Sequence, residues 1–290
     1  MIQSNFIPGV LFVETPRHST VPLILDSPHS GSMYPADFGA SAPRKGLRRT
    51  EDMYVDELFA DAPRCGASLL GALFPRSYID PNRAESDLDP ALLAEPWPRP
   101  LKPSRKSEIG VGLVWRYCPP GNPVYDRKLS IAEIMHRIER FHRPYHAALK
   151  HLLEQSYRRF GAVWHINCHS MMGYSNSFNR KGPRVRRPDI TLGDRDGTAC
   201  APEFTAFVRA QFEAMGYEVK VNKPYRGVEL IRAYSDPATR RHSLMIEINR
   251  TLYMDELTFA KHSKFATLRA DLAKLVAAMA AYVREQISNK

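Results

Sequence analysis

The pattern of apolar and polar positions along the chain predicts an α/β protein. Stretches rich in apolar, β-branched and aromatic residues are expected to form strands at residues 22–26, 67–80 in two pieces, 162–168, 217–222 and 243–249. Apolar residues at three-and-four spacing predict helices at 51–61, 130–160, 202–215 and 255–287. Because strands alternate with helices, we expect an α/β sandwich around a mixed or largely parallel sheet, with residues 1–290 forming a single domain.

The longest of these helices carries its own start signal. Ser130 is a suitable N-cap residue, and Glu133 follows it at the spacing of a capping box. Pro144 lies inside the apolar pattern, where it is expected to kink the helix without ending it.

Composition narrows the class of protein. Of the 290 residues, 43% are hydrophobic and 25% charged, which is typical of a globular chain. No apolar run reaches the roughly 18 residues of a membrane span, and the N-terminus lacks the basic and apolar regions of a signal peptide. We therefore expect no membrane partner and a cytoplasmic location. The cysteines are widely spaced and are expected to be reduced thiols: Cys65, Cys118, Cys168 and Cys200.

Positive charge leaves two kinds of partner open. The formal net charge is +10, with dense basic patches at residues 44–49 and 180–188. Such patches attract nucleic acid or small anions, and they are equally common as solvated surface. Because the chain lacks an aromatic-rich basic groove motif and a recognition helix, we favour a small anion and expect no nucleic acid.

Polar side chains gather where the predicted strands end. In open α/β sheets, ligands bind beyond the carboxyl ends of the strands. The residues at or just after four predicted strand ends are His29; Asp80, Asn82 and Arg83; His169 and Ser170; and Glu247, Asn249 and Arg250. We expect these side chains to share one edge of the sheet.

Two histidines in this set suggest a metal site. His29 and His169 each follow a buried strand, and they could bind one ion together with a carboxylate and water. Asp52 or Glu51 could supply that carboxylate, although both also suit a helix start. His165 is interpreted as structural. A nucleophilic Cys168 paired with His169 is disfavoured, because adjacent strand residues point to opposite faces.

Glu247, Arg83 and Arg232 complete the candidate chemistry. Glu247 interrupts an apolar strand, so it is expected either to pair with an arginine or to act as a general base with a shifted pKa. Arg83 and Arg232 are candidate binders of a carboxylate. Alternatively, Arg83 pairs with Asp80, and Arg232 is simply an exposed residue.

The motifs resemble those of one known family. "LDSPHSG", "RTEDMYVDELF", "FPRSYIDPNR", "GLVWRY", "INCHSM" and "PATRRHSLMIEINRTLYMDE" are similar, in this order, to motifs of the N-formylglutamate amidohydrolases, and the likeness covers nearly the whole chain. The resemblance implies a three-layer α/β/α sandwich similar to zinc-dependent exopeptidases. It also implies hydrolysis of N-formyl-L-glutamate to formate and L-glutamate in histidine degradation, with Zn²⁺ or another divalent metal as cofactor and a small anionic N-acyl amino acid as substrate.

The resemblance also assigns roles residue by residue. It implies His29, Asp52 and His169 as metal ligands, with Asp52 favoured over Glu51; Glu247 and Arg83 as catalytic; and Arg83, Arg232 and Asn82 as substrate-binding. The chain departs from some family members in having Asn167 before the second histidine and Val228-Glu229 after Gly227. A different N-acyl amino acid is the alternative substrate, and a basic nucleic-acid-binding protein is the alternative class.

Overall fold

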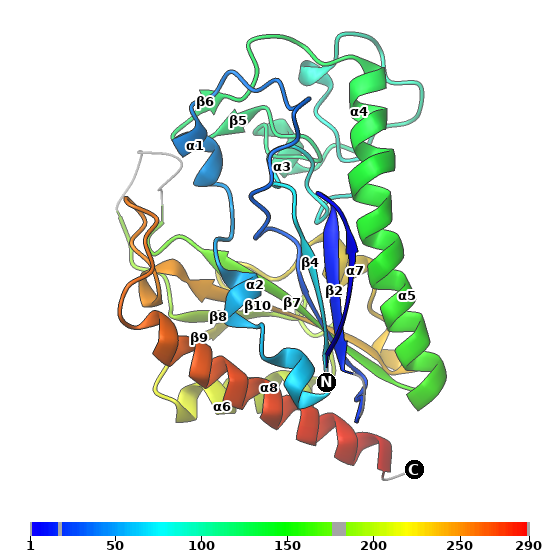
Figure 1. Ribbon diagram of the computed structural model, residues 1–290, viewed down its shortest axis with the longest axis vertical. Coiled ribbons are helices and arrows are strands. Elements are labelled where there is room, and N and C mark those ends of the chain that lie inside the picture. The colour runs from blue at the N-terminus through cyan, green and yellow to red at the C-terminus, as the bar shows by residue number, and fades with distance from the viewer. Residues whose placement is uncertain (1, 17–18, 176–183, 289–290) are drawn as a thin grey trace.

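A mixed sheet forms the centre of the computed structural model, which describes residues 2–16, 19–175 and 184–288 (Figure 1). Its eight strands lie in the order β1 (Ile2–Ile7), β2 (Leu11–Pro16), β4 (Ser68–Ala72), β3 (Leu23–Ser27), β7 (Val163–Met171), β10 (Arg241–Asn249), β8 (Ile190–Gly193) and β9 (Val219–Val221). The central strands β4, β3, β7 and β10 run parallel, whereas β1, β2 and β8 pair antiparallel with their inner neighbours. The mixed sheet is confirmed.

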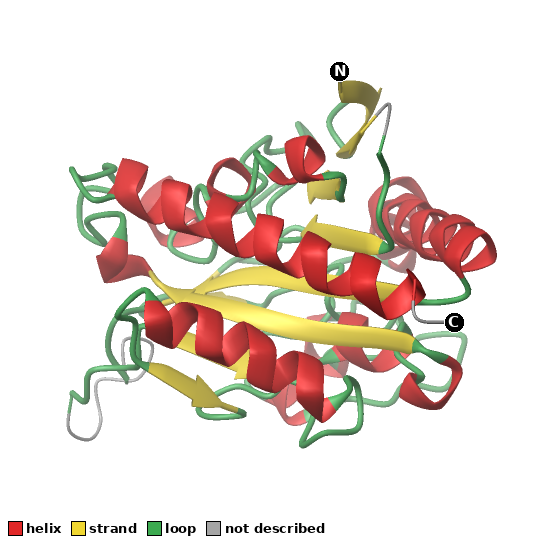
Figure 2. Cartoon of the chain, turned by 90° about the horizontal axis from the view of Figure 1, so that it is seen from below, coloured by secondary structure: helices red, strands yellow, loops and turns green. Residues whose placement is uncertain are grey.

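Helices cover both faces of this sheet, which confirms the three-layer sandwich. On one face lie α2 (Val55–Leu58), α6 (Pro202–Ala214) and α8 (Phe265–Ser288), of which Figure 2 shows the two long helices α6 and α8 in front of the strands. On the other face lie α4 (Ile131–Arg137) and α5 (Arg143–Phe160), which form the long vertical helix of Figure 1.

Strand alternation explains why the two faces differ. Side chains at alternate positions of a strand point to opposite faces. The buried residues that pack toward α6 and α8 are apolar, and they include Leu23, Leu25, Ile166, Cys168, Leu244, Ile246 and Ile248. The intervening positions toward the carboxyl ends of the same strands are polar, and they include Asp26, Asn167, His169 and Glu247.

The predicted helix at 130–160 is present but irregular. Ser130 caps α4, and the reciprocal bonds between Ser130 and Glu133 complete the expected capping box. A π-helical turn at Ile138–His142 joins α4 to α5 and stands directly before Pro144. A proline has no N–H to donate, and the widened turn lets the helix continue past it.

Other element boundaries differ from the prediction. The stretch 67–80 forms only β4, because the chain turns after Phe74, where the N–H of Tyr78 donates to the carbonyl of Pro75 (3.0 Å). The helix predicted at 51–61 is reduced to α2, and the one predicted at 255–287 begins at Phe265. Strands β1, β2 and β8 were not predicted. Further short elements are α1 (Arg44–Arg48), α3 (Arg105–Glu108), α7 (Glu229–Ala233), β5 (Tyr117–Cys118) and β6 (Asn122–Pro123).

The cysteines and the apolar character of the helices complete the description of the fold. The four cysteines are free, and all except Cys65 are buried. Within the described residues, no helix has both the length and the apolar character that crossing a bilayer requires.

Candidate active site

The turn after β3 binds the segment that carries Asp52. The N–H of Asp52 donates to the carbonyl of His29 (2.9 Å), and the Ser30 hydroxyl donates to the carbonyl of Asp52 (2.9 Å). Gly31 is required in this turn, because a Cβ there would lie 2.3 Å from the carbonyl oxygen of Phe74. The "SPHSG" turn therefore brings His29 and Asp52 together, and Asp52 lies in a loop before α2 instead of opening a helix.

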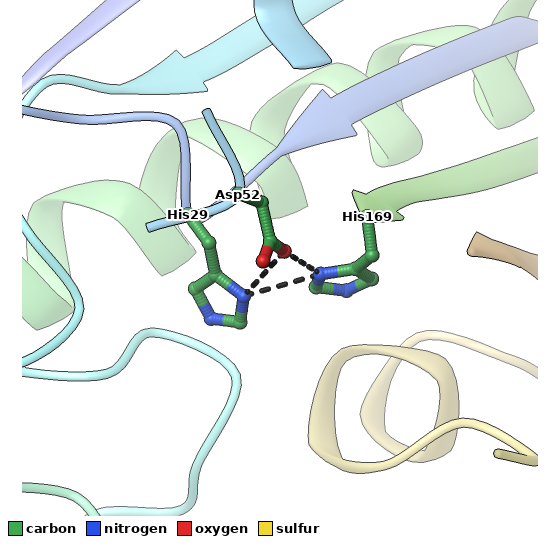
Figure 3. A group of neighbouring side chains, drawn as sticks. All are labelled: His29, Asp52 and His169. Atoms are coloured by element: carbon green, nitrogen blue, oxygen red, sulfur yellow. Dashed lines mark hydrogen bonds and ion pairs between the residues drawn. The ribbon is translucent and has the colours of Figure 1, made fainter. Parts of the chain in front are cut away.

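Three buried side chains converge at this point (Figure 3). Asp52 Oδ2 lies 3.3 Å from His29 Nδ1 and 2.9 Å from His169 Nδ1, and the two Nδ1 atoms are 3.1 Å apart. Ligand atoms around a tetrahedral Zn²⁺ with bonds of about 2.0–2.2 Å lie about 3.3–3.5 Å from one another. The group therefore fits a small divalent ion after an outward movement of a few tenths of an ångström.

The ring of His29 is oriented by the carboxylate of Asp80, in the loop that follows β4. His29 Nε2 donates to Asp80 Oδ1 (2.7 Å), and Asp80 Oδ2 accepts from Nη2 of Arg76 (2.9 Å). Burial alone would raise the pKa of Asp80, but the charges of Arg76 and His29 hold it well below its usual value. An ionised Asp80 keeps the proton on Nε2 and leaves Nδ1 free to bind a metal.

A relay through an amide orients His169. Asn167 Nδ2 donates to Asp26 Oδ1 (2.8 Å), so Asn167 Oδ1 faces His169 Nε2 (2.7 Å) and accepts its proton. Asp26 also accepts from His165 Nε2 (2.8 Å) and the Tyr145 hydroxyl (2.7 Å). Asp26 therefore supports His169 and does not contact His29. Although the chain departs from some family members at Asn167, His169 is still connected to a carboxylate. That carboxylate is Asp26, and the side chain of Asn167 lies between the two.

The second carboxylate oxygen of Asp52 is bound by an arginine. Arg250 Nη2 donates to Asp52 Oδ1 (3.0 Å), which leaves Oδ2 facing the two histidines. Burial would raise the pKa of Asp52, but the hydrogen bonds of His169 and His29 lower it well below the usual range. Glu51 lies outside this group, because it accepts from the Tyr34 hydroxyl (2.7 Å) and pairs with Arg48 (3.3 Å). Between the two candidate carboxylates, the structure brings only Asp52 to the histidines.

Glu247 lies beside His169 through strand register. β10 and β7 are parallel and pair Glu247 with His169, so both side chains stand on the same face of the sheet. Burial raises the pKa of Glu247 to about 7, and the charge of Asp52 adds to the rise, whereas His169, Arg76 and Arg250 oppose it. A carboxyl with a pKa near neutrality is suited to accept and return a proton.

The loop after β4 supplies Asn82 and Arg83. Asn82 Nδ2 lies 3.2 Å from His169 Nε2, and Asn82 Oδ1 accepts from the N–H of Leu230 (2.9 Å). Arg83 is buried and donates to the carbonyls of Asn82 (2.8 Å) and Val111 (3.3 Å). Its Nε lies 3.9 Å from Asp87 Oδ2, a long contact to a different aspartate from the Asp80 considered in the sequence.

Two stacked histidines, one at the end of the π-helical turn and one on α5, hold this loop in place. His142 Nε2 bonds to the carbonyl of Arg83 and His146 Nε2 to that of Pro81, both at 2.8 Å, and the two rings lie 4.2 Å apart. Burial lowers the pKa of His146 to about 4, with a further contribution from His142. Both rings are thus held neutral beneath the loop.

Arg232 is not part of this group. It lies on α7, where its exposed guanidinium makes two hydrogen bonds to Glu229 (2.7 and 3.0 Å). Glu229 is one of the residues in which the chain departs from some family members, and its negative charge is balanced by Arg232. The structure thus places Arg232 on a helix, exposed and with an acidic partner of its own.

Sequence reasoning missed Arg76, and it named Arg250 only as a strand-end residue without a partner. Arg76 precedes Asp80 by four residues, and Arg250 directly follows the "IEIN" strand, but neither position indicates that its partner is a metal-site carboxylate. His165 was interpreted correctly as structural, since it bonds to Asp26 and Ser243. Cys168 points away from His169 into the apolar core, where burial raises its pKa well above the usual value.

Several arginines of the two basic patches are paired within the molecule. In α1, Arg44 stacks over the Tyr34 ring (3.3 Å to the centroid) and Arg48 pairs with Glu51, so this patch is partly engaged within the molecule. Residues 180–183 of the second patch lie outside the described residues, whereas Arg186 pairs with Asp189 (2.6 Å).

The fold and the site together define an α/β protein with a buried His–Asp–His group suited to a metal ion. A model of the N-formylglutamate amidohydrolase family matches residues 21–254 of the chain. The chain therefore belongs to the N-formylglutamate amidohydrolase family.

Individual relatives agree with this assignment. The chain is 28% identical to N-formylglutamate deformylase of Pseudomonas aeruginosa over 278 residues, which cover 93% of this chain and 97% of the relative. It is 26% identical to the enzyme of the same name from Pseudomonas putida over 264 residues, 88% of this chain and 87% of the relative. The crystal structure of N-formylglutamate amidohydrolase from Ralstonia eutropha JMP134 superposes with a TM-score of 0.92 at 48% identity and covers 96% of this chain and 100% of that one.

Proposed function

We propose that this protein hydrolyses N-formyl-L-glutamate to formate and L-glutamate with the help of a divalent metal ion. The convergence of His29 Nδ1, His169 Nδ1 and Asp52 Oδ2 within 3.3 Å of one another, beside Glu247, carries the proposal. The names of the family and of its relatives supply the substrate, and histidine degradation is proposed as the pathway on the same ground.

His29, Asp52 and His169 would hold the ion, with Zn²⁺ as our first choice. The donor set of two imidazoles and one carboxylate is one that zinc accepts, and Asp80, Asn167 and Arg250 orient the three ligands. When bound, such an ion polarises a carbonyl and lowers the pKa of water toward about 7.

Glu247 is the proposed proton carrier. It would accept the proton of the attacking water and then return it to the leaving nitrogen of L-glutamate, so that formate and a free amine result. Its raised pKa suits both halves of this transfer, because the carboxylate form accepts and the acid form donates close to neutral pH.

Arg83 is the proposed binder of one substrate carboxylate. It would also stabilise the oxyanion that forms on the formyl group. Its side chain is buried beside Asn82, the neighbour of His169, and a guanidinium there would hold an anion close to the reacting amide. Asn82 is proposed to contact the substrate as well as to support the loop.

The test combines metal analysis with a substrate panel. Protein purified without chelator is expected to contain about one divalent ion per chain and to hydrolyse N-formyl-L-glutamate faster than N-formimino or N-acetyl analogues. Glu247→Gln is expected to lower kcat by about 10² to 10⁴-fold and to retain the metal. A wild-type protein that hydrolyses none of the panel, with or without added Zn²⁺, would contradict the proposal, as would a Glu247→Gln variant as fast as wild type.

A further inference from the structure

Arg187 is a half-buried cation at the edge of the proposed site. Its N–H donates to the carbonyl of Gly173 (2.9 Å), and its own carbonyl accepts from Asn249 Nδ2 (3.2 Å). Gly173 follows the end of β7 by two residues, and Asn249 is the last residue of β10. Arg187 is therefore attached to the ends of the two strands that carry His169 and Glu247.

The guanidinium of Arg187 is oriented but has no acidic partner. Its Cζ lies 5.2 Å from the centre of the Tyr225 ring, and Nη1 donates to the carbonyl of Met172 (3.3 Å). Among the described residues, no carboxylate lies within ion-pair distance of Arg187, whereas its neighbour Arg186 pairs with Asp189 at 2.6 Å. A guanidinium that is held in place by stacking, and that still has N–H groups to donate, is suited to bind an anion.

Tyr225, the ring beside this arginine, lies close to β8 and β10. The segment around Tyr225 lies directly against β8, where a Cβ on Gly193 would come within 2.7 Å of the backbone of Arg226. Tyr225 packs against a small apolar cluster that contains Met245, which stands two residues before Glu247 on the same face of the strand. Burial raises the pKa of Tyr225, and the charges of Arg187 and Glu247 both act on it, in opposite directions.

A second cation approaches from α3. The carbonyl of Lys106 accepts from the N–H of Val111 (2.8 Å), and the carbonyl of Val111 accepts from Arg83 Nε (3.3 Å), so Lys106 is tied to Arg83. Burial of the ammonium group lowers the pKa of Lys106, and the charges of Arg83 and Arg76 lower it further, although the residue as a whole is exposed. The charge of Glu247 opposes this lowering of the pKa, whereas that of Arg187 adds to it.

We propose that Arg187, assisted by Lys106, binds the side-chain carboxylate of the substrate and thereby selects an acidic N-formyl amino acid. This inference rests on the proposed function, in which Arg83 binds the other carboxylate. A substrate with two carboxylates needs two cationic positions, and Arg83 and Arg187 come from different segments, one in the loop after β4 and one before β8. Arg232, which the sequence favoured for this role, is already paired with Glu229.

The test compares a charged substrate with its neutral isostere. Arg187→Gln is expected to lower kcat/KM for N-formyl-L-glutamate by about ten- to hundredfold, mainly through KM, because a hydrogen-bonded ion pair is lost. Hydrolysis of N-formyl-L-glutamine should stay unchanged, so the preference for the acidic substrate falls by the same factor. Lys106→Gln should reduce this preference less. Arg186→Gln, which removes the adjacent exposed charge, is the matched control and should leave the preference as in wild type.

Direct binding separates this inference from the proposed function. Calorimetric titration with L-glutamate and L-glutamine measures the same charge preference without turnover. If wild type binds L-glutamate better than L-glutamine and Arg187→Gln does not, the inference is supported even when no formyl substrate is hydrolysed. An unchanged preference in Arg187→Gln, or a loss caused by Arg232→Gln instead, overturns it, as does wild-type protein that binds both ligands equally or neither.

Discussion

The two faces of the central sheet differ in kind, although the same strands build both. Toward α6 and α8, Leu25, Ile166 and Ile246 pack into a continuous apolar core. On the opposite face, the carboxyl ends of these strands carry Asn167 and Glu247 among other polar groups. An apolar side chain is satisfied by any close-packed neighbour, whereas a buried polar group needs a partner of the right chemistry in the right direction. The first face therefore contributes to stability alone, whereas the second, which is also apolar beneath α4 and α5, carries the chemistry as well.

Removal of a metal-site histidine is expected to have the largest effect on the polar face. His169→Ala should lower hydrolysis of N-formyl-L-glutamate by at least about a thousandfold, because a lost ligand removes several kcal/mol of transition-state stabilisation. Metal content measured by mass spectrometry should fall in parallel. His151→Ala, an exposed histidine of α5, is the control. Retained metal and activity in His169→Ala would remove the basis for assigning chemistry to this face.

A truncation on the apolar face should act on stability alone. Leu25→Ala removes a side chain that is 0% exposed, and it is expected to lower the free energy of unfolding by about 2–5 kcal/mol. Denaturant unfolding measures this loss, while kcat of the folded fraction should stay at the wild-type value. Leu257→Ala, at a leucine that is 67% exposed, should change neither quantity. A large fall in kcat for Leu25→Ala at unchanged stability would contradict the division between the faces.

The same contrast explains how far the sequence predicts the structure. Apolar periodicity is local, so it located β3, β7, β10 and α6 to within a few residues. It failed where a long-range contact overrides local pattern: residues 51–54 look like a helix start, yet the N–H of Asp52 bonds to His29. β7 continues through His169, which was expected to follow it, because β10 pairs with it over its full length. The single domain over residues 1–290 stays a prediction.

Within the site, the residues at strand ends were predictable and their partners were not. His29, Asp52 and His169 come together as expected from the resemblance, but their ligand roles stay a proposal. The supports Asp80, Arg250 and the Asp26–Asn167 relay depend on side-chain directions that no spacing encodes. The substrate-binding role that the resemblance implies for Arg232 stays a prediction, and the structure adds that Arg232 is paired with Glu229.

The relay to His169 offers a smaller test of the polar face. Asn167→Leu keeps the size of the side chain and removes the acceptor of the His169 Nε2 proton. Metal affinity, measured by competition with a chelator, is expected to fall about ten- to hundredfold, as is usual when a group that orients a ligand is lost. Cys168→Ala changes the next residue on the apolar face and should lower stability without changing metal affinity. Equal affinities of wild type and Asn167→Leu would show that His169 needs no such support.

The smallest expected effect concerns the pH dependence of stability at the loop beneath the site. His146 has a pKa of about 4 in the folded protein and an ordinary value of 6.5. As pH falls from 6.5 toward 4, His146 binds a proton in the unfolded chain but not in the folded protein. The stability that the neutral ring contributes is therefore lost in this window and is fully present above it. Glu247 acts with the opposite sign, because its raised pKa makes the folded protein bind the extra proton below pH 7.

The contribution of His146 is therefore measured as a difference between two proteins. His146→Gln retains a donor for the carbonyl of Pro81 but has no titrating group. Between pH 6.5 and 4, the free energy of unfolding should fall by about 1 kcal/mol more in wild type than in the variant, a modest value because the ring is partly exposed to solvent. If the free energy of unfolding depends on pH in the same way in both proteins, the pKa of His146 does not differ between the folded and the unfolded state. The idea that the fold holds this ring neutral beneath the loop would then be wrong.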